Sequence, residues 1–154
     1  MNQVEPVRKQ ILVEAAQERA FRVFTDGIDR WWPRRHHIGK SPLARAVLEP
    51  RVGGRWYAVC EDGSECDTGK VLVWEPPNRL VLAWQISSQW QYDAAFSTEV
   101  EVRFIVEGPK RTRVELEHRQ LERYAEAAPE FKKMIDAPGG WGQILEQYSQ
   151  SAAE

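Results

Sequence analysis

The 154-residue chain has little of three things: cysteine, charge of one sign and long apolar runs. No window approaches the stretch of about 18 apolar residues that a membrane-spanning helix needs. The polar segment from Met1 to Arg8 carries both charge signs and has no apolar region of the kind that secretory signals contain. We therefore expect neither membrane insertion nor secretion, and a cytoplasmic location.

The near balance of charge and the scarcity of cysteine exclude two further kinds of site. The chain has 21 basic and 23 acidic side chains, whereas nucleic-acid-binding domains usually show a strong basic excess or a basic stripe. Cys60 and Cys66 flank a turn-like stretch and supply at most half of a zinc site, because no further ligands appear near them at matching spacing. In the cytoplasm these thiols should stay reduced. No nucleic acid, metal or cofactor is expected.

What the chain has in excess is tryptophan, with seven residues of this type. The rest of the composition, 42% hydrophobic and 29% charged, is typical of an ordinary globular protein. The length fits one domain over residues 1–154, large enough to bury a core without a metal or a disulfide. Composition alone does not tell whether the tryptophans serve that core or a binding site.

Apolar periodicity predicts a run of strands between helices. Strands are expected at residues 7–13, 45–49, 55–60, 70–74, 79–86, 98–106 and 112–119. Helical patterns cover residues 15–24, one further turn at 28–32, the segment 122–136 with Pro129 interrupting it, and a long C-terminal helix at 137–152. Strands set apart from helices favour an α+β domain with an antiparallel sheet. Because the strands are half polar, one sheet face should be wet, and a strongly curved sheet tends to leave a pocket between its other face and a helix.

Short motifs rich in tryptophan, glycine and proline span nearly the whole chain. They are Trp31-Trp32-Pro33, the run from Glu49 to Trp56, Asp62-Gly63, Gly69-Lys70-Val71, the run from Pro76 to Trp84, Ser97-Thr98-Glu99-Val100 and Gly140-Trp141. In this order they resemble the START-like SRPBCC superfamily, and within it the branch similar to activators of the heat-shock protein 90 ATPase. The resemblance implies a helix-grip fold: a curved antiparallel sheet of about seven strands around a long C-terminal helix, with two short helices after the first strand.

Fold resemblance by itself leaves the function open. Members of the superfamily bind hydrophobic small molecules or lipids, act as polyketide cyclases or aromatases, or assist a chaperone. The leading hypothesis is non-catalytic binding of a small hydrophobic or aromatic ligand in a cavity between the sheet and the helix. The alternatives are a polyketide cyclase-like enzyme and a chaperone-associated interaction module, although the chain lacks the additional domain that such activators carry. A homodimer is compatible with each of these.

The predicted ligand-binding residues face the interface between the sheet and the helix. Trp84 lies on the apolar face of its strand, and Trp141 and Leu145 belong to the apolar stripe of the C-terminal helix. Ligand pockets are typically apolar and aromatic, but core packing is the simpler interpretation of any single tryptophan. The residues expected to line the cavity are Trp32, Trp84, Phe104, His118, Trp141 and Leu145.

His118 is the titratable residue that strand parity places among apolar neighbours. It is either a neutral, hydrogen-bonded structural residue or a polar handle, or general acid or base, in the cavity. His36 and His37 stand beside Arg34 and Arg35, and we interpret them as part of a solvated basic loop. No catalytic residue is predicted, because the chain has no nucleophile elbow, no paired histidines on a helix and no nucleophile with an evident base.

Overall fold

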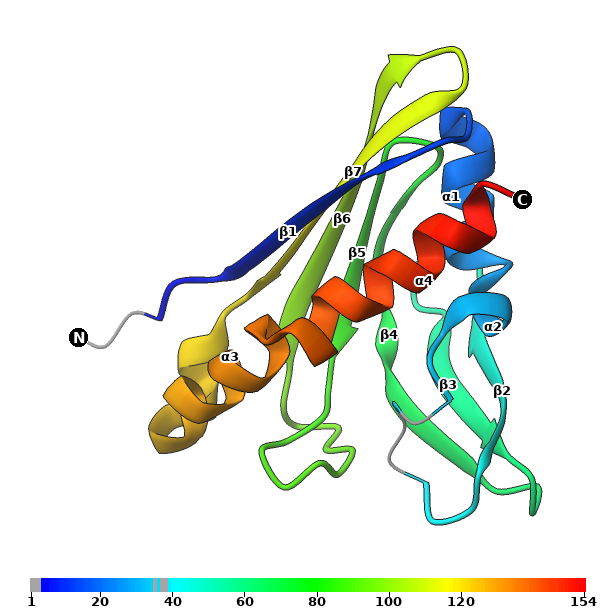
Figure 1. Ribbon diagram of the computed structural model, residues 1–154. Coiled ribbons are helices and arrows are strands. Elements are labelled where there is room, and N and C mark those ends of the chain that lie inside the picture. The colour runs from blue at the N-terminus through cyan, green and yellow to red at the C-terminus, as the bar shows by residue number, and fades with distance from the viewer. Residues whose placement is uncertain (1–3, 35, 37–38) are drawn as a thin grey trace.

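Seven strands form an antiparallel sheet in the computed structural model, which describes residues 4–34, 36 and 39–154 (Figure 1). The strand order is β1-β7-β6-β5-β4-β3-β2, so the first strand joins the last at one edge. The strands are β1 (Val7–Val13), β2 (Leu43–Leu48), β3 (Arg55–Cys60), β4 (Glu65–Glu75), β5 (Arg79–Trp84), β6 (Thr98–Gly108) and β7 (Arg111–Arg119). The predicted α+β class and the curved antiparallel sheet are confirmed.

The helices gather on one face of this sheet. Two short helices follow β1, namely α1 (Gln17–Thr25) and α2 (Ile28–Trp31). After β7 come the 3-10 helix η1 (Leu121–Ala127), α3 (Ala128–Asp136), the π-helical turn η2 (Pro138–Gly142) and α4 (Gln143–Ala152). Figure 1 shows α3 and α4 running diagonally across the sheet, so that the sheet curls around them as the helix-grip expectation requires. Within the described residues, no helix is long and apolar enough to cross a membrane.

Strand parity decides which side chains reach the inner face of the sheet. Leu80, Val102 and Leu116 lie directly opposite one another on β5, β6 and β7, and all three are buried. Because side chains alternate between the two faces with a period of two, every second residue of these strands joins the same apolar layer. This layer is the surface on which α1, α3 and α4 pack, and it positions the inner-face residues of β5 and β7 discussed below.

β4 is longer than its sequence pattern predicts, since it begins at Glu65 and not at residue 70. Its first residues show no apolar alternation, yet their backbone continues the ladder to β3, with Gly69 opposite Trp56. Gly69 is needed at this place because a Cβ would lie 1.7 Å from the carbonyl oxygen of Ala83 on β5. Backbone pairing and a close strand approach, neither visible in side-chain periodicity, set the length of this strand.

The C-terminal helix, predicted as one piece over residues 137–152, is broken near its start. Gly140 has non-helical backbone angles (φ −92°, ψ −130°), and the regular α-helix begins only at Gln143. A Cβ at Gly140 would lie 2.3 Å from the carbonyl oxygen of Ile135, so glycine permits the chain to pass this close to α3. The segment 122–136, expected to be interrupted at Pro129, is divided just before it into η1 and α3. Pro129 stands in the first turn of α3, where its missing N–H has no helical partner.

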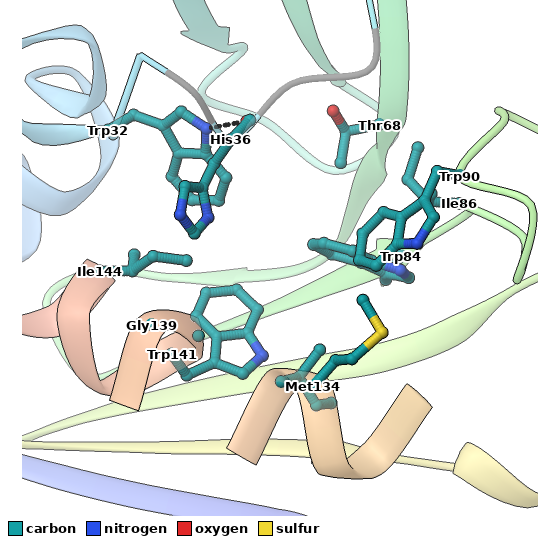
Figure 2. A pocket seen from close by; sticks show the side chains of 12 residues that line it. Trp32, His36, Thr68, Trp84, Ile86, Trp90, Met134, Gly139, Trp141 and Ile144 are labelled. Carbon is teal, nitrogen blue, oxygen red and sulfur yellow. Dashed lines mark hydrogen bonds between the residues drawn. The ribbon is translucent and has the colours of Figure 1, made fainter. Parts of the chain in front are cut away.

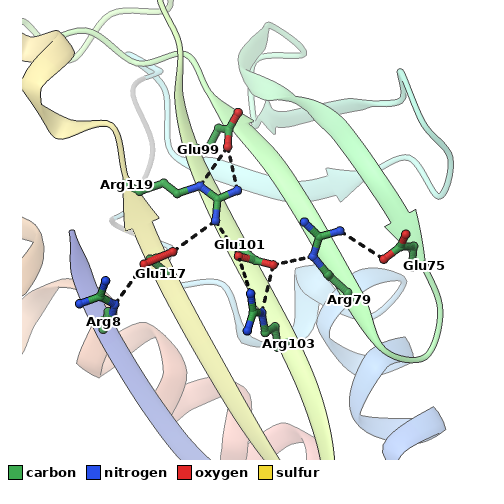
Figure 3. Close-up of polar contacts among 8 residues, drawn as sticks. All are labelled: Arg8, Glu75, Arg79, Glu99, Glu101, Arg103, Glu117 and Arg119. Carbon is green, nitrogen blue, oxygen red and sulfur yellow. Dashed lines mark hydrogen bonds and ion pairs between the residues drawn. The ribbon is translucent and has the colours of Figure 1, made fainter.

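The outer face of the sheet carries a network of paired charges (Figure 3). Glu101 on β6 is only 3% exposed and accepts hydrogen bonds from Arg79, Arg103 and Arg119. Although burial raises the pKa of Glu101, these three guanidinium groups lower it to about 2. The outer face is therefore covered by charges that satisfy one another, and the inner face is the one that offers an apolar site.

Candidate functional site

A pocket of about 580 Å³ opens between the sheet, α3, η2 and the segment that follows α2 (Figure 2). This volume lies within the range of about 300–1,000 Å³ that is typical of small-molecule sites. Trp90 and Met134 are 39% and 51% exposed and mark its mouth. The lining residues are Trp32, His36, Thr68, Trp84, Ile86, Trp90, Met134, Ile135, Gly139, Gly140, Trp141 and Ile144.

Segments that are far apart in the sequence each supply one part of the pocket wall. Trp84 comes from the inner face of β5, and Trp32 follows α2 with an extended backbone (φ −61°, ψ 125°) of the kind favoured before a proline. The break in the C-terminal helix places Trp141 inward, where it is 2% exposed. Trp90, between β5 and β6, has a left-handed backbone (φ 60°), and its ring packs 5.2 Å from that of Phe131 on α3.

Four buried tryptophans form a closed ring beside the pocket, which we call the tryptophan tetrad: Trp32, Trp56, Trp84 and Trp141. Their ring centroids are 5.7 Å apart for Trp32 and Trp56, and 5.8 Å apart for Trp56 and Trp84. The remaining sides are 5.9 Å from Trp84 to Trp141 and 6.2 Å from Trp141 to Trp32. All four contacts are edge-to-face, the geometry that aromatic quadrupoles favour. The tetrad therefore holds its rings in fixed orientations against the pocket.

Of the four tryptophans that line the pocket, Trp32, Trp84 and Trp141 have an indole nitrogen that is hydrogen-bonded to a protein atom or fully buried. The Trp32 N–H donates to the backbone carbonyl of His36 (2.7 Å), and the Trp141 N–H donates to Nδ1 of His118 (3.1 Å). The indole nitrogen of Trp84 is fully buried. The three tryptophans consequently offer the pocket mainly carbon surface.

His118 lies behind Trp141, fully buried, and both of its ring nitrogens are engaged. Because Nδ1 accepts the Trp141 N–H, Nε2 carries the proton and donates it to the Thr98 hydroxyl, 2.8 Å away. The hydroxyl in turn donates to the backbone carbonyl of Trp84 at 3.4 Å. Burial lowers the pKa of His118 to about 3. The imidazole is therefore neutral at physiological pH and links the two tryptophans Trp84 and Trp141.

The six residues predicted to line the cavity fall into two groups in the structure. His118, Phe104 and Leu145 are buried but are not among the lining residues. Phe104 packs against the ring of Phe21 at 5.1 Å, on the side of the core near α1. The predicted residues that do line the pocket are Trp32, Trp84 and Trp141.

Sequence reasoning missed several lining residues, of which His36 is the most informative. We interpreted it as part of a solvated loop, but it is half-buried and lines the pocket. Its neighbours Arg35 and His37 lie outside the described residues. Ile86 shares the strand parity of Trp84 and could have been found from that signal, whereas Met134 has no counterpart in any pattern of the sequence.

Groups of three or more metal-ligating side chains are absent from the residues that the structure describes. Cys60, at the end of β3, and Cys66, near the start of β4, are free thiols. Burial raises the pKa of the Cys66 thiol, and the nearby Cys60 adds to this shift. Neither cysteine lines the pocket.

Residues 14–151 match the sequence profile of the family described as Activator of Hsp90 ATPase homolog 1-like protein. The chain belongs to this family. Within the START-like superfamily that contains it, a solved structure of an anthrahydroquino-gamma-pyrone synthase, Txn09, is 37% identical over 97% of this chain and 99% of its own, with a TM-score of 0.68. A self-sacrificing resistance protein, CalC from Micromonospora echinospora, is 30% identical over 98% of this chain and 96% of its own, with a TM-score of 0.72. No curated protein sequence matches the chain significantly.

Proposed function

We propose that this member of the family binds a flat, hydrophobic aromatic small molecule in the pocket without transforming it. The observation that carries the proposal is the wall of Trp32, Trp84 and Trp141, which faces a space of about 580 Å³ mainly with carbon surface. The N–H groups of Trp32 and Trp141 donate to protein acceptors, and the indole nitrogen of Trp84 is buried. Such a wall gains affinity by burying apolar area, at about 25 cal/mol per Å². The helix-grip fold of the family is typical of hydrophobic ligand binding, which supports the same conclusion.

A second candidate is an enzyme of the cyclase type, because the 37% identical relative is named as an anthrahydroquino-gamma-pyrone synthase. The sequence suggested His118 as the proton-transfer group of such an enzyme. Its buried position, its two hydrogen bonds and its lowered pKa do not fit that role. His36 is the titratable side chain among the lining residues that the structure describes, so a reaction in this pocket would use it instead.

The other expectations from the sequence are a chaperone partner, a homodimer and a cytoplasmic location, and they have less support than ligand binding. A chaperone-associated role is supported by the family name alone. A homodimer stays a prediction. We place the binding function in the cytoplasm, where thiols such as Cys60 and Cys66, both free, stay reduced.

The proposal is tested by titrating the protein with planar aromatic probes, such as anthraquinones, while following tryptophan fluorescence and heat. Wild-type protein should show saturable quenching with a single site. Met134→Glu places a charge at the apolar mouth, where the half-exposed side chain can be replaced without disturbing the core. We expect it to weaken binding about tenfold, equivalent to about 1.4 kcal/mol.

Val106→Glu is the matched control, since Val106 is also an exposed apolar residue, at 57%, but does not line the pocket. It should bind the probes as the wild type does. Absence of saturable binding across the whole set of probes would contradict the proposal, as would equal losses in both variants. Mass spectrometry of the recovered probe separates binder from enzyme, because only an enzyme returns an altered molecule.

A further inference from the structure

We propose that Trp90 is the specificity-determining residue of the pocket, and that its ring selects planar ligands of three or more fused rings over smaller ones by stacking on them at the mouth. The assignment rests on the proposed function, since it concerns the size of the ligand that the pocket takes. It follows from the rings that pack behind Trp90, from the way its backbone is held, and from the volume of the pocket.

Trp90 belongs to a group of packed aromatic rings that joins the β5–β6 connection to η1 and α3. Tyr124 in η1 stacks on Phe131 in α3, with ring centroids 3.9 Å apart and an interplanar angle of 22°. The Trp90 ring packs on Phe131 in turn, at 5.2 Å and 32°. The Tyr124 hydroxyl donates to the backbone carbonyl of Ile86 (2.7 Å), which fixes the group to the sheet side of the pocket. Of these three rings, Tyr124 and Phe131 are buried, whereas Trp90 is 39% exposed and lines the pocket, so its free surface can stack on a planar ligand.

The backbone holds Trp90 at the mouth in a conformation that bulky residues rarely adopt. Its φ of 60° lies in the left-handed region, where a side chain other than glycine is strained. The backbone N–H of Trp90 donates to the carbonyl of Ser87 (2.9 Å), and the N–H of Ser87 donates to the carbonyl of Gln91 (2.8 Å). These bonds close a tight turn that carries the indole ring, so little conformational freedom remains to be lost when a ligand stacks on it. Strain of this kind is typical of residues that clamp ligands.

The pocket is too large for a single ring to fill. A cavity of about 150 Å³ holds one benzene molecule, whereas this pocket measures about 580 Å³. Figure 2 shows Trp90 on the opposite side of the pocket from Trp32. A small ligand buries most area against the enclosed wall of Trp32 and Trp141 and leaves Trp90 uncovered, whereas a longer planar ligand contacts both sides.

The indole N–H gives Trp90 a second way to contact a ligand, because it can donate a hydrogen bond to a nitrogen or oxygen atom. Two ligands that carry the same acceptor gain alike from such a bond. The ratio of their affinities therefore reports the stacking of the additional ring and not the hydrogen bond.

The experiment compares quinoline, with two fused rings, and acridine, with three, by titration calorimetry on full-length protein above neutral pH, where both are uncharged. Each probe has one ring nitrogen as its acceptor, and wild-type protein should bind acridine more tightly. Trp90→Ala should weaken acridine binding about five- to tenfold and change quinoline binding by less than about twofold, because the smaller probe does not reach the mouth. Trp90→Phe keeps a planar ring without the N–H and should retain most of the preference for acridine.

Tyr92→Ala is the matched control, since Tyr92 lies in the same connection and is also 39% exposed but does not line the pocket. It should leave both affinities at their wild-type values. The assignment would be overturned, while the binding function stands, by a ratio that Trp90→Ala leaves unchanged or by the same loss of acridine binding in Tyr92→Ala.

Two further results would also overturn it. If Trp90→Phe lost as much preference as Trp90→Ala, a flat ring at this position would not be what selects the ligand. If wild-type protein bound acridine no more tightly than quinoline, or bound neither, the pocket would not select by ring number. The anthraquinone titration described above then decides separately whether the proposed function stands.

Discussion

Lowering the pH is predicted to destabilise the protein through His118. The imidazole is fully buried, and burial lowers its pKa from 6.5 to about 3. In the unfolded chain the same group takes up a proton near its ordinary pKa. Between these two values the unfolded state therefore binds one more proton than the folded state, and the free energy of unfolding falls as the pH falls. Above this window the group is neutral in both states and adds no pH dependence.

The loss of stability on acidification depends much more on the pKa of His118 in the unfolded chain than on its pKa in the folded protein. At pH 5 the unfolded histidine is almost fully protonated, while a folded imidazole with a pKa of about 3 is almost fully neutral. Each unit of difference corresponds to about 1.4 kcal/mol, so a change from about pH 7.5 to about pH 5 should lower the free energy of unfolding by about 2 kcal/mol. That is a substantial part of the roughly 5–15 kcal/mol that stabilises a typical domain.

The assay is urea unfolding at a series of pH values for wild-type protein and His118→Gln. Glutamine offers one acceptor and donors, as the neutral imidazole does, but it does not titrate. The overall stability of the variant does not enter the comparison, because the test is how much the free energy of unfolding of each protein changes between about pH 7.5 and about pH 5. The wild type should lose about 2 kcal/mol more than the variant on acidification, because the other titrating groups are common to both proteins. Parallel profiles would refute the conclusion that His118 is held neutral.

Two further predictions concern the break in the C-terminal helix and the charged outer face. Gly140→Ala should destabilise the protein by about 1–3 kcal/mol in urea unfolding, because the new Cβ would clash with the carbonyl oxygen of Ile135. The control is Gly139→Ala, whose Cβ would have no neighbour within 4 Å, and it should change the stability by less than about 0.5 kcal/mol. Glu101→Gln should lower stability by about 2 kcal/mol above pH 4.5, since three partly exposed arginines lose a buried carboxylate. In the wild type this contribution should disappear as the pH falls from 4.5 toward the folded pKa of about 2. Glu99→Gln, a change at a more exposed carboxylate, should have a smaller effect.

Much of the fold could be predicted from the sequence because strand parity is a local signal. The alternation in β6 and β7 placed Val102 and Leu116 on the inner face, and the ladder puts them opposite each other. The same parity placed Trp84 and His118 inside, where both are buried. Local patterns did not predict the element boundaries that backbone contacts determine. The start of β4 depends on pairing with β3, and the break at Gly140 depends on its contact with Ile135.

The site could be predicted only in part, because a pocket is a property of tertiary arrangement. The periodicity of strands and helices predicts which side chains are buried, but it does not distinguish those that line the pocket from those that pack in the core. Phe104 and Trp84 share the inner face, yet the first packs under α1 and the second lines the pocket. Met134 and His36 come from an exposed helix face and a basic segment, which sequence patterns assign to solvent.

Three members of the tryptophan tetrad pack in the core and also line the pocket. Trp56 closes the ring without lining the pocket, while Trp32, Trp84 and Trp141 touch both the ring and the pocket. Truncating any of these three would remove buried aromatic contacts that stabilise the fold together with the surface offered to a ligand, so a loss of binding would have no unique cause. Substitutions at positions that line the pocket but do not pack in the core can therefore change ligand binding without changing the stability of the fold. Met134 at the mouth is one such position, and His36 is another.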